Sequence, residues 1–423
     1  MKVLVVGGGG REHALAWKLS KSSLVSEIFV APGNGGTEIE ESIQNIAIDS
    51  NDIEGLSDFA KKSGIDLTIV GPEDPLVNGI TDKFQDEGLL CFGPSKDAAR
   101  LEGSKEFMKD FLLRNKIPTA SYKTFTDSEK AINYIKEQGC PIVIKADGLA
   151  AGKGVTVAFD INQAKEAVNQ SLNSKVFGDA GTKIVVEEYL EGEEASFIVL
   201  TDGNKVIPFA SSQDHKARDN GDLGPNTGGM GAYSPAPVVT NSVHKKILDE
   251  VIYPTIEGLN SEGSSYCGFL YAGVMVDPNQ NIKVLEFNCR FGDPETQPIL
   301  LRLKSSLVEL CLAAIDDQLN DYQIQWTDEH ACGVVIASQG YPEDYTKNNE
   351  VTFEFSNMEG KKLFHAGTKL QDDKVLTSGG RVFCATALGK NLHEAQSKAY
   401  DLVESVSFDG AFYRKDIGNK GLK

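Results

Sequence analysis

The segment 282–295, IKVLEFNCRFGDPE, holds the residues whose types and spacing are best suited to chemistry. Its alternating, β-rich character predicts a strand over 283–287, and side chains two apart on a strand project from the same face. Glu286 and Asn288 thus present a carboxylate and an amide oxygen side by side, with Leu285 and Phe287 on the opposite face. Hard cations such as Mg²⁺ take oxygen ligands, usually protein groups together with the phosphates of a nucleotide. The pattern favours a metal site beside a bound nucleotide.

Arg290 and Asp293 follow directly, in a turn broken by glycine and proline, where both can reach the same centre. For an isolated Glu-x-Asn the simpler interpretation is a strand that ends in an exposed polar turn. The metal interpretation therefore depends on whether other segments supply a nucleotide site.

Composition limits the class of protein that can carry such a site. A chain of 423 residues exceeds one simple core, and 40% hydrophobic with 24% charged residues is ordinary for a soluble globular protein. The formal net charge of −19 argues against a partner that is a nucleic acid or an anionic membrane. Seven scattered cysteines without a C-x-x-C pair are typical of reduced thiols. With no signal peptide and no bilayer-spanning run, we expect a soluble, cytoplasmic protein.

A glycine run follows the first apolar stretch. Gly7 to Gly10 stand between the apolar run 3–6 and a helix that opens with Arg11 and Glu12. Free backbone N–H groups at such a turn form an anion site, which makes Gly8, Gly9 and Gly10 candidate ligand contacts. Glu12 stands where the G-x-G-x-x-G fingerprint needs its third glycine, so a phosphate-bearing small molecule is favoured over NAD and a dehydrogenase is disfavoured. A tight turn without a ligand is the alternative.

Two further strand-then-loop units, 27–36 and 67–75, follow the same plan. Strands that alternate with helices and end in glycine-rich loops predict an open parallel sheet with ligands at the carboxyl ends of its strands. This unit closes near residue 100.

Two lysines enter segments suited to phosphates. Lys105 lies near the start of a helix predicted over 104–115, where a cation is unfavourable unless an anion is nearby. The strand 141–145 carries Lys145 into the loop 146–155, ADGLAAGKGV, which lacks the Walker A spacing. We interpret the loop as a glycine flap over a triphosphate, with Lys145 and Lys153 facing the charge. A solvated lysine and a plain hairpin turn are the alternatives.

Two polar segments come next. The strand and acidic run 183–194, KIVVEEYLEGEE, is either a solvated turn or a clamp whose backbone binds adenine and whose carboxylate binds ribose. The Gly/Pro-rich stretch 211–237 is long enough to be an active-site loop or disordered. Its Asp214, His215, Lys216 and Asn226 are mixed donors and acceptors, which favours the active-site loop.

The remaining pattern predicts two hairpins, 195–209 and 268–287, and an amphipathic helix over 243–259. Pro298 begins a helix that runs with Leu303 and Leu307 inward. From about residue 328, short β runs and one late helix predict a small α+β domain, in which Arg381 is a weak candidate for a functional role.

Taken in order, Lys105, Lys145 with its flap, the EEYLEGEE segment and EFN resemble the ATP-grasp enzymes. Longer strings are similar to the phosphoribosylamine–glycine ligase (glycinamide ribonucleotide synthetase) family of purine biosynthesis: GGGGREH, APGNGGT, GPEDPL, KADGLAAGKGV, SQDHK, GPNTGGMGAYSP and NCRFGDPETQ. The likeness covers nearly the whole chain. One departure is Ala217, which follows the His-Lys pair where that family commonly has a basic residue; Arg218 comes one position later.

The resemblance implies an α/β and α+β multidomain fold. It has an N-terminal open parallel sheet over 1–102, an ATP-grasp domain over 103–327 with a mobile lid at about 119–190, and a C-terminal α+β domain over 328–423. The implied reaction is ATP-dependent ligation of glycine to 5-phosphoribosylamine through glycyl phosphate, by a monomer without nucleic-acid or membrane partners. Another ATP-grasp carboxylate–amine ligase or carboxylase is the nearest alternative. A non-catalytic nucleotide sensor would not need so many charged groups around one phosphate chain.

The resemblance also implies roles for individual residues. Lys105 and Lys145 neutralise ATP phosphates, Glu286 and Asn288 hold Mg²⁺ or Mn²⁺, and Arg290 steadies the acyl phosphate. The implied nucleotide contacts are Glu187, Glu188, Leu190, Glu194 and Asn226, and the candidate substrate contacts are Gly8, Gly9, Gly10, Asp214 and Asp293.

Overall fold

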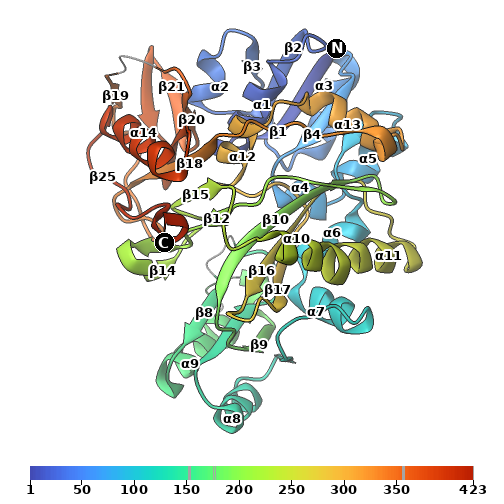
Figure 1. Ribbon diagram of the computed structural model, residues 1–423, viewed down its shortest axis with the longest axis vertical. Coiled ribbons are helices and arrows are strands. Elements are labelled where there is room, and N and C mark those ends of the chain that lie inside the picture. Colours follow the sequence, from blue (N-terminus) through green and yellow to red (C-terminus); the bar gives the residue numbers. More distant parts are fainter. Residues whose placement is uncertain (151–153, 175, 177, 355–357, 423) are drawn as a thin grey trace.

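The computed structural model describes residues 1–150, 154–174, 176, 178–354 and 358–422 (Figure 1). Its first hundred residues form a sheet in the order β3-β2-β1-β4-β5 whose pairings are all parallel, which confirms the predicted open parallel sheet. The strands are β1 (Lys2–Gly7), β2 (Glu27–Pro32), β3 (Ile43–Asn45), β4 (Leu67–Val70) and β5 (Cys91–Phe92). The helices are α1 (Gly10–Leu19), α2 (Gly35–Ile39), α3 (Ile53–Ser63), α4 (Glu73–Val77), α5 (Ile80–Asp86) and α6 (Lys96–Gly103).

The strand order reverses direction between β1 and β4. Sheets of this kind bind ligands at such a switch point, beyond the carboxyl ends of the strands. The apolar run in β1 suits this central place, because Leu4 and Val6 pack into one hydrophobic cluster while Val3 and Val5 pack into another. The loops after β1 and β4 are thereby held at the edge that faces the rest of the molecule.

Two antiparallel sheets follow, drawn in the lower half of Figure 1. The central sheet, in the order β11-β10-β16-β17, is built from β10 (Glu193–Thr201), β11 (Val206–Pro208), β16 (Gly268–Val276) and β17 (Ile282–Asn288). The lid sheet, in the order β6-β9-β7-β8, is built from β6 (Tyr122–Phe125), β7 (Ile142–Ala146), β8 (Val155–Ala158) and β9 (Ile184–Glu188). Helix α7 (Lys105–Arg114) precedes the lid sheet, which packs with α8 (Ser128–Gln138) and α9 (Ile161–Val168). Both predicted hairpins, β10–β11 and β16–β17, are confirmed.

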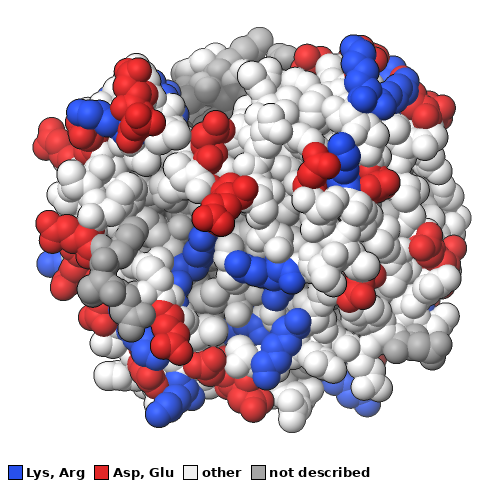
Figure 2. Space-filling view, turned by 90° about the horizontal axis from the view of Figure 1, so that it is seen from above, with Lys and Arg blue, Asp and Glu red and all other residues white. Residues whose placement is uncertain are grey.

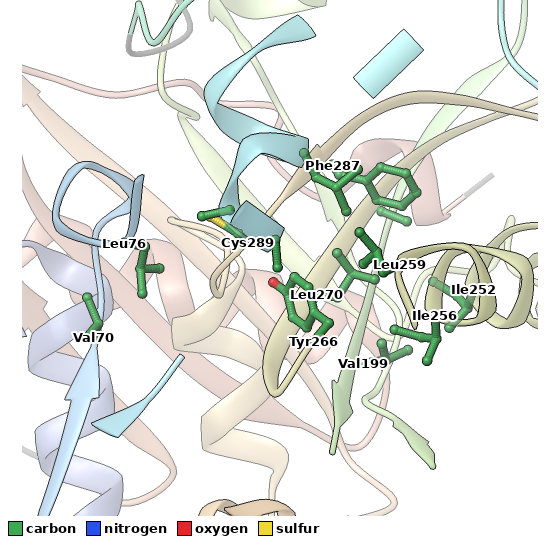
Figure 3. Packing of buried hydrophobic residues seen from close by; sticks show 14 of the residues in the cluster. Val70, Leu76, Val199, Ile252, Ile256, Leu259, Tyr266, Leu270, Phe287 and Cys289 are labelled. Carbon is green, nitrogen blue, oxygen red and sulfur yellow. The ribbon is translucent and has the colours of Figure 1, made fainter. Parts of the chain in front are cut away.

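One hydrophobic cluster joins the N-terminal domain to the central sheet (Figure 3). It contains Val70 and Leu76 from the first domain together with Leu270 and Phe287 from β16 and β17. The lid has a separate cluster, formed by residues such as Ile144. The described part of the lid is therefore a packing unit of its own, whereas the first domain and the central sheet share a core.

The C-terminal sheet takes strands from two parts of the chain. Its order is β12-β15-β18-β23-β20, with β25 also paired to β18, and α14 packs against it. The elements of this sheet and its helix are β12 (Gln213–Asp214), β15 (Gly231–Ser234), β18 (His330–Ser338), β20 (Lys361–His365), β23 (Arg381–Gly389), β25 (Ala411–Phe412) and α14 (Leu392–Glu404). Two separate two-stranded sheets accompany it, one of β19 (Thr352–Phe353) and β24 (Val406–Ser407), the other of β21 (Thr368–Gln371) and β22 (Lys374–Thr377). The predicted small α+β domain is confirmed.

The stretch 211–237 is not the single long loop that the sequence predicted. It contains β12, β13 (Ala217–Asp219), β14 (Leu223–Asn226) and β15. Local composition suggested a loop because glycine and proline interrupt it, yet β15 pairs with β18 about a hundred residues later, and such a partner is invisible in the local pattern. The pairing ties this stretch to the C-terminal sheet.

The helical predictions had mixed outcomes. The amphipathic helix over 243–259 is present as α10 (Asn241–Ile247), a π-helical turn (Leu248–Ile252) and α11 (Tyr253–Ser261). The single helix predicted from Pro298 is wrong. The chain forms α12 (Thr296–Arg302) and α13 (Leu307–Ile315), separated by an extended Leu303 that forms a β-bridge with Trp326.

Surface charge is mixed on the face drawn in Figure 2, where Lys and Arg side chains stand beside Asp and Glu side chains. On this face the excess negative charge does not form a patch of one sign. Among the described residues, no helix is both long enough and apolar enough to span a membrane.

Candidate nucleotide and metal site

A cavity of about 390 Å³ brings together residues from all three domains. Loops of the N-terminal domain, the lid sheet, the central sheet and Arg381 of the C-terminal sheet all contribute to its wall. Twelve of the residues singled out in the sequence line it: Lys105, Lys145, Glu187, Glu188, Leu190, Glu194, Asp214, Asn226, Glu286, Asn288, Arg290 and Asp293.

Strand β17 places Glu286 and Asn288 on the cavity wall through a β-bulge. Its pairing with β16 slips by one residue, so that Leu285 has no partner on β16. A bulge of this kind shifts the side chains that follow it to the other face of the strand. Leu285 and Phe287 both border the cavity, but Leu285 is partly exposed and Phe287 is buried, so the two residues do not share one environment as simple alternation predicted.

Glu286 is held ionised by Lys216, which the sequence analysis named as a polar residue of the stretch 211–237 but gave no role. The ammonium nitrogen of Lys216 lies 3.0 Å from Glu286 Oε1 and 2.5 Å from Glu194 Oε1. Lys216, opposed by burial and assisted by Lys145 and Lys105, lowers the pKa of Glu286 to about 2. The signal that could have found Lys216 is the SQDHK string that carried part of the resemblance.

The donor set fits a hard cation that is bound partly by a nucleotide. Glu286 and Asn288 offer oxygen atoms at one wall of the cavity. In the part of the chain that the structure describes, no group of three or more His, Cys, Asp or Glu side chains is placed to hold a metal ion. An ion at Glu286 would therefore need further oxygen ligands from phosphates, which is the usual arrangement for Mg²⁺.

Lys145 reaches the same wall from the lid. Its ammonium nitrogen lies 3.0 Å from the carbonyl oxygen of Leu285, the residue before Glu286, and 3.1 Å from Glu187 Oε1. The other carboxylate oxygen of Glu187 lies 2.8 Å from Lys109, which is fully buried. Sequence reasoning missed Lys109; its spacing of four from Lys105 on one helix is the signal that could have found it.

The flap is docked onto the start of α7. The Glu106 N–H donates to Asp147 Oδ1 at 2.7 Å, and Lys105 donates to the Gly148 carbonyl oxygen at 3.0 Å. A carboxylate at a helix N-terminus is stabilised by the helix dipole. The anion that the sequence required near Lys105 is thus available from Asp147. Lys153 and Gly152 lie outside the described residues.

The acidic segment is engaged at its start and its end, at Glu187, Glu188 and Glu194, while the turn 191–193 between them is exposed. The Glu187 side chain is buried between two lysines. Glu188 accepts hydrogen bonds from the Ser121 N–H and hydroxyl at 2.9 Å and pairs with Lys283 at 2.6 Å. The backbone from 187 to 190 passes along the cavity.

The glycine run has one of its backbone N–H groups, that of Gly9, already occupied. The Gly9 N–H donates to Glu12 Oε2 at 2.6 Å, and Glu12 also accepts from Arg11. A carboxylate in this place excludes a dinucleotide pyrophosphate from the turn. The residues that line the cavity do not include Gly8, Gly9 and Gly10; a Cβ on Gly9 would lie 3.4 Å from Asp293 Oδ2, so the run borders Asp293.

Arg290 joins the domains in a buried ion network. Its Nη2 lies 2.7 Å from Glu102 Oε1, and its Nε lies 3.1 Å from Glu73 Oε2. Burial raises the pKa of Glu73, but Arg290 and Arg11 outweigh it and hold that pKa at about 2. Burial raises the pKa of Glu102, and Arg290 opposes this.

The C-terminal domain contributes Arg381. Its guanidinium donates to the carbonyl oxygens of Gly228 and Asp293 at 2.6 Å and lies 3.3 Å from Asp293 Oδ2. Nearby, burial and the charge of Glu295 raise the pKa of Asp214 well above its usual range.

The departure from the family pattern at position 217 has a structural counterpart. The Ala217 carbonyl oxygen accepts from Arg414 at 3.0 Å, and Arg218 pairs with Asp219 at 2.9 Å. Arg218 is not among the cavity-lining residues that the structure describes, so the shifted basic residue does not reach the site.

A lid sheet that carries lysines and faces a central sheet that carries oxygen donors defines an ATP-grasp protein. Family profiles agree: residues 103–296 match "Phosphoribosylglycinamide synthetase, ATP-grasp (A) domain", residues 1–102 match its N domain and residues 331–420 its C domain. The chain belongs to the phosphoribosylglycinamide synthetase family.

Individual relatives are similar over their full length. The chain is 58% identical to "Phosphoribosylamine--glycine ligase" of Salmonella typhi and 57% identical to that of Escherichia coli (strain K12), in each case over 100% of this chain and 99% of the relative. The crystal structure of phosphoribosylamine--glycine ligase from Thermotoga maritima is 32% identical with a TM-score of 0.85, covering 99% of this chain and 100% of that one. A biotin carboxylase from Campylobacter jejuni shares the fold at 15% identity, with a TM-score of 0.75 over 97% of this chain and 92% of that one.

Proposed function

We propose that the chain joins glycine to 5-phosphoribosylamine with ATP, giving glycinamide ribonucleotide, ADP and phosphate, as a cytoplasmic monomer in purine biosynthesis. The name of its full-length relatives supports this reaction. The observation that carries the proposal is that Lys145 lies against the carbonyl of Leu285 at the wall that bears Glu286. A phosphate-binding cation and a metal-binding carboxylate thereby face one cavity.

The reaction has two steps. An oxygen of the glycine carboxylate attacks the γ-phosphorus of ATP, the bond to the β-phosphate oxygen breaks, and ADP leaves. The amine of phosphoribosylamine then attacks the carbonyl carbon of glycyl phosphate, phosphate leaves with the C–O bonding pair, and the new amide nitrogen loses a proton. Such steps need positioned charges more than a covalent nucleophile.

Lys105 and Lys145 neutralise the phosphates. Burial lowers the pKa of Lys105, and the charge of Glu286 opposes this shift. Glu286 and Asn288 hold Mg²⁺ or Mn²⁺, which when bound supplies further positive charge at the phosphates. Arg290 faces the acyl phosphate with a guanidinium already oriented by two carboxylates.

The base and ribose lie along the acidic segment. The backbone of Glu187 and Leu190 contacts adenine beside Glu188, Glu194 accepts from the ribose hydroxyls, and Asn226, which also lines the cavity, contacts the nucleotide. The engagement of the Glu188 carboxylate by Lys283 supports a backbone contact more than a side-chain contact there.

The substrates lie toward the N- and C-terminal domains. Asp214 and Asp293 face glycine or phosphoribosylamine, whose amino groups suit carboxylate acceptors, and the run Gly8 to Gly10 borders Asp293. The lid, at about 119–190, closes over the cavity and excludes water that would hydrolyse glycyl phosphate. Its separate hydrophobic cluster supports movement as a unit. Boundaries at 102/103 and 327/328 separate the three domains.

The test is an assay with purified protein, ATP, glycine and phosphoribosylamine generated in solution, with ADP release measured enzymatically and product mass by mass spectrometry. We expect ADP and glycinamide ribonucleotide to form together, and to require both substrates and a divalent ion. An equal rate with bicarbonate or D-alanine in place of glycine would establish the alternative ligase or carboxylase.

Lys145→Ala sharpens the same test. We expect a higher KM for ATP and a lower kcat, because the phosphates lose a fixed cation. Lys136→Ala, at an exposed position of α8 on the same lid, is the matched control and should behave as wild type. A wild-type kcat for Lys145→Ala at saturating ATP would contradict its role.

A further inference from the structure

Lys109 is a fully buried lysine at the junction of three elements. It projects from α7, its ammonium lies 2.8 Å from Glu187 Oε2 on β9, and it donates to the Thr119 hydroxyl at 2.8 Å. The Thr119 hydroxyl in turn donates to the Val284 carbonyl oxygen of β17 at 2.8 Å. A single side chain therefore links the helix before the lid, the lid and the strand that carries Glu286.

A lysine in this place is costly for stability alone. Removing an ammonium and a carboxylate from water costs several kcal/mol per ion, and a well-packed apolar pair is often at least as stable. Met108, Phe111 and Leu112 of the same helix are buried apolar residues, so a further apolar residue would suit this environment. The charge at position 109 calls for a reason beyond packing.

The geometry supplies that reason. Glu187 is shared, with Oε1 on Lys145 at 3.1 Å and Oε2 on Lys109 at 2.8 Å. Two ammonium groups and one carboxylate carry a net charge of about +1, and Lys145 is the member of the three that ends at the phosphate-binding part of the cavity. Without Lys109, the carboxylate would neutralise Lys145 instead, and the attraction for a polyphosphate would fall.

We propose that Lys109 is a positioning residue of the nucleotide site, which balances Glu187 so that Lys145 keeps its charge and its place for the phosphates of a bound nucleotide. This inference rests on the proposed function, because it takes a nucleotide as the occupant of the cavity.

The titration of Lys109 offers a readout that a packing role would not change. Burial, with the nearby charge of Lys145, lowers the pKa of Lys109 to about 8, although Glu187 and Glu188 oppose the shift. Lys109 is thus charged at neutral pH and loses its proton as the pH rises past about 8. ADP affinity should fall over that range in the wild-type protein and not in a variant that is neutral at position 109.

The experiment measures ADP binding by titration calorimetry at fixed Mg²⁺, from about pH 7 to about pH 9.5, for the full chain and three variants. Lys109→Met removes the charge, and Lys109→Arg keeps it at every pH. Lys18→Met is the matched control. Lys18 is partly buried and, like Lys109, has a pKa lowered to about 8, but it donates to the Leu303 carbonyl oxygen and does not line the cavity.

We expect Lys109→Met to bind ADP about ten-fold more weakly than wild type at neutral pH, a factor that corresponds to one pKa unit of interaction, and to match wild type near the alkaline limit. Lys109→Arg should keep its neutral-pH affinity at alkaline pH, and Lys18→Met should follow the wild-type curve. Wild-type affinity and pH dependence in Lys109→Met would overturn the inference.

The variants also separate this inference from the proposed function. If Lys109→Met does not fold, Lys109→Arg decides, because an alkaline loss of affinity equal to that of wild type would exclude Lys109 as its source. Failure of the wild-type protein to bind ADP would defeat the proposed function itself, whereas wild-type binding with an unaltered Lys109→Met curve defeats only the role of Lys109.

Discussion

Replacing Arg290 by methionine should destabilise the fold to an extent that depends on pH. The substitution leaves Glu102, whose side chain is 6% exposed, without the guanidinium that lies 2.7 Å from it. The remaining partner of Glu102 is Cys289, whose N–H donates to it at 2.7 Å and whose thiol donates at 3.0 Å. An uncompensated buried charge costs about 3–5 kcal/mol, so the carboxyl of Glu102 escapes part of that cost by taking a proton.

Protonation of Glu102 sets the largest possible loss of unfolding free energy and its dependence on pH. An unfolded-state glutamate has a pKa near 4.3, and each pH unit above it costs about 1.4 kcal/mol to keep the proton, or about 3.7 kcal/mol at pH 7. Burial already raises the pKa of Glu102 in the wild-type protein, and the loss of Arg290 raises it further, so stability relative to wild type is lost as the pH rises above the wild-type pKa of Glu102. We expect little difference near pH 4.3 and a loss that grows to at most about 3.7 kcal/mol near pH 7.

The assay is urea unfolding at several pH values, followed by circular dichroism and by the fluorescence of Trp17 and Trp326, whose agreement checks for a single transition. The double variant Arg290→Met/Glu102→Gln removes one of the two carboxyls that lose Arg290, so it should recover part of the loss at pH 7 and show a shallower pH slope, and the remaining slope belongs to Glu73. The single variant Glu102→Gln, in which Arg290 keeps Glu73, completes the cycle. A pH-independent loss in Arg290→Met, or no recovery in the double variant, would refute the reasoning.

Three further outcomes follow from the same contacts. Glu286→Gln should lower metal-dependent turnover by roughly 100-fold while metal-free ADP binding, measured by calorimetry, stays near wild type; equal turnover would contradict the metal assignment. Asp147→Ala removes the carboxylate that accepts from the Glu106 N–H, so it should cost about 1 kcal/mol in urea unfolding and raise the KM for ATP. Asp127→Ala, at the N-cap of α8, is the control: it should cost as much stability and leave the KM for ATP unchanged. Burial raises the pKa of Glu40, but His13 and Lys362 outweigh it and lower that pKa to about 2. The ionised Glu40 therefore stabilises the fold above about pH 4.5, and this stabilisation is lost as the pH falls toward 2. Glu40→Gln should show a shallower acid loss of stability in the same assay, and an unchanged acid limb would exclude this contact.

Much of the fold could be read from local patterns because its strands are apolar runs bounded by turn residues. The strand over 67–70 and both hairpins lie where alternation and turn residues placed them. Strands β12 and β15 could not be found in that way, because their pairing partners are remote and their own composition is that of a loop. The helix predicted from Pro298 failed for a related reason: Leu303 is apolar and suits a helix, but its bridge to Trp326 requires an extended chain.

Within the site, residue types were more informative than their exact orientation. Glu286, Asn288 and Lys145 line one cavity, as their separate patterns suggested. The orientation of Leu285 could not be derived, because a bulge is created by two strands and the sequence of one of them does not contain it. Lys109 was hidden for another reason. A lysine within an amphipathic helix is expected on the solvated face, and its burial depends on Glu187, which is far away in the chain.

The N-termini of helices α1 and α7 are both occupied by carboxylates of the chain itself. The sequence indicated an anion at the N-terminus of α1 and another at α7, and in both places a carboxylate of the chain accepts the backbone N–H: Glu12 from Gly9, and Asp147 from Glu106. A phosphate that bound at either helix would have to displace a carboxylate side chain of the protein, Glu12 or Asp147. Phosphate affinity must therefore come mainly from side-chain cations such as Lys145, whose charge can be adjusted by neighbours. A site built on backbone N–H groups would respond only to the ionisation of the phosphate itself, at about pH 6, whereas this one should also respond to the protonation of buried lysines at alkaline pH.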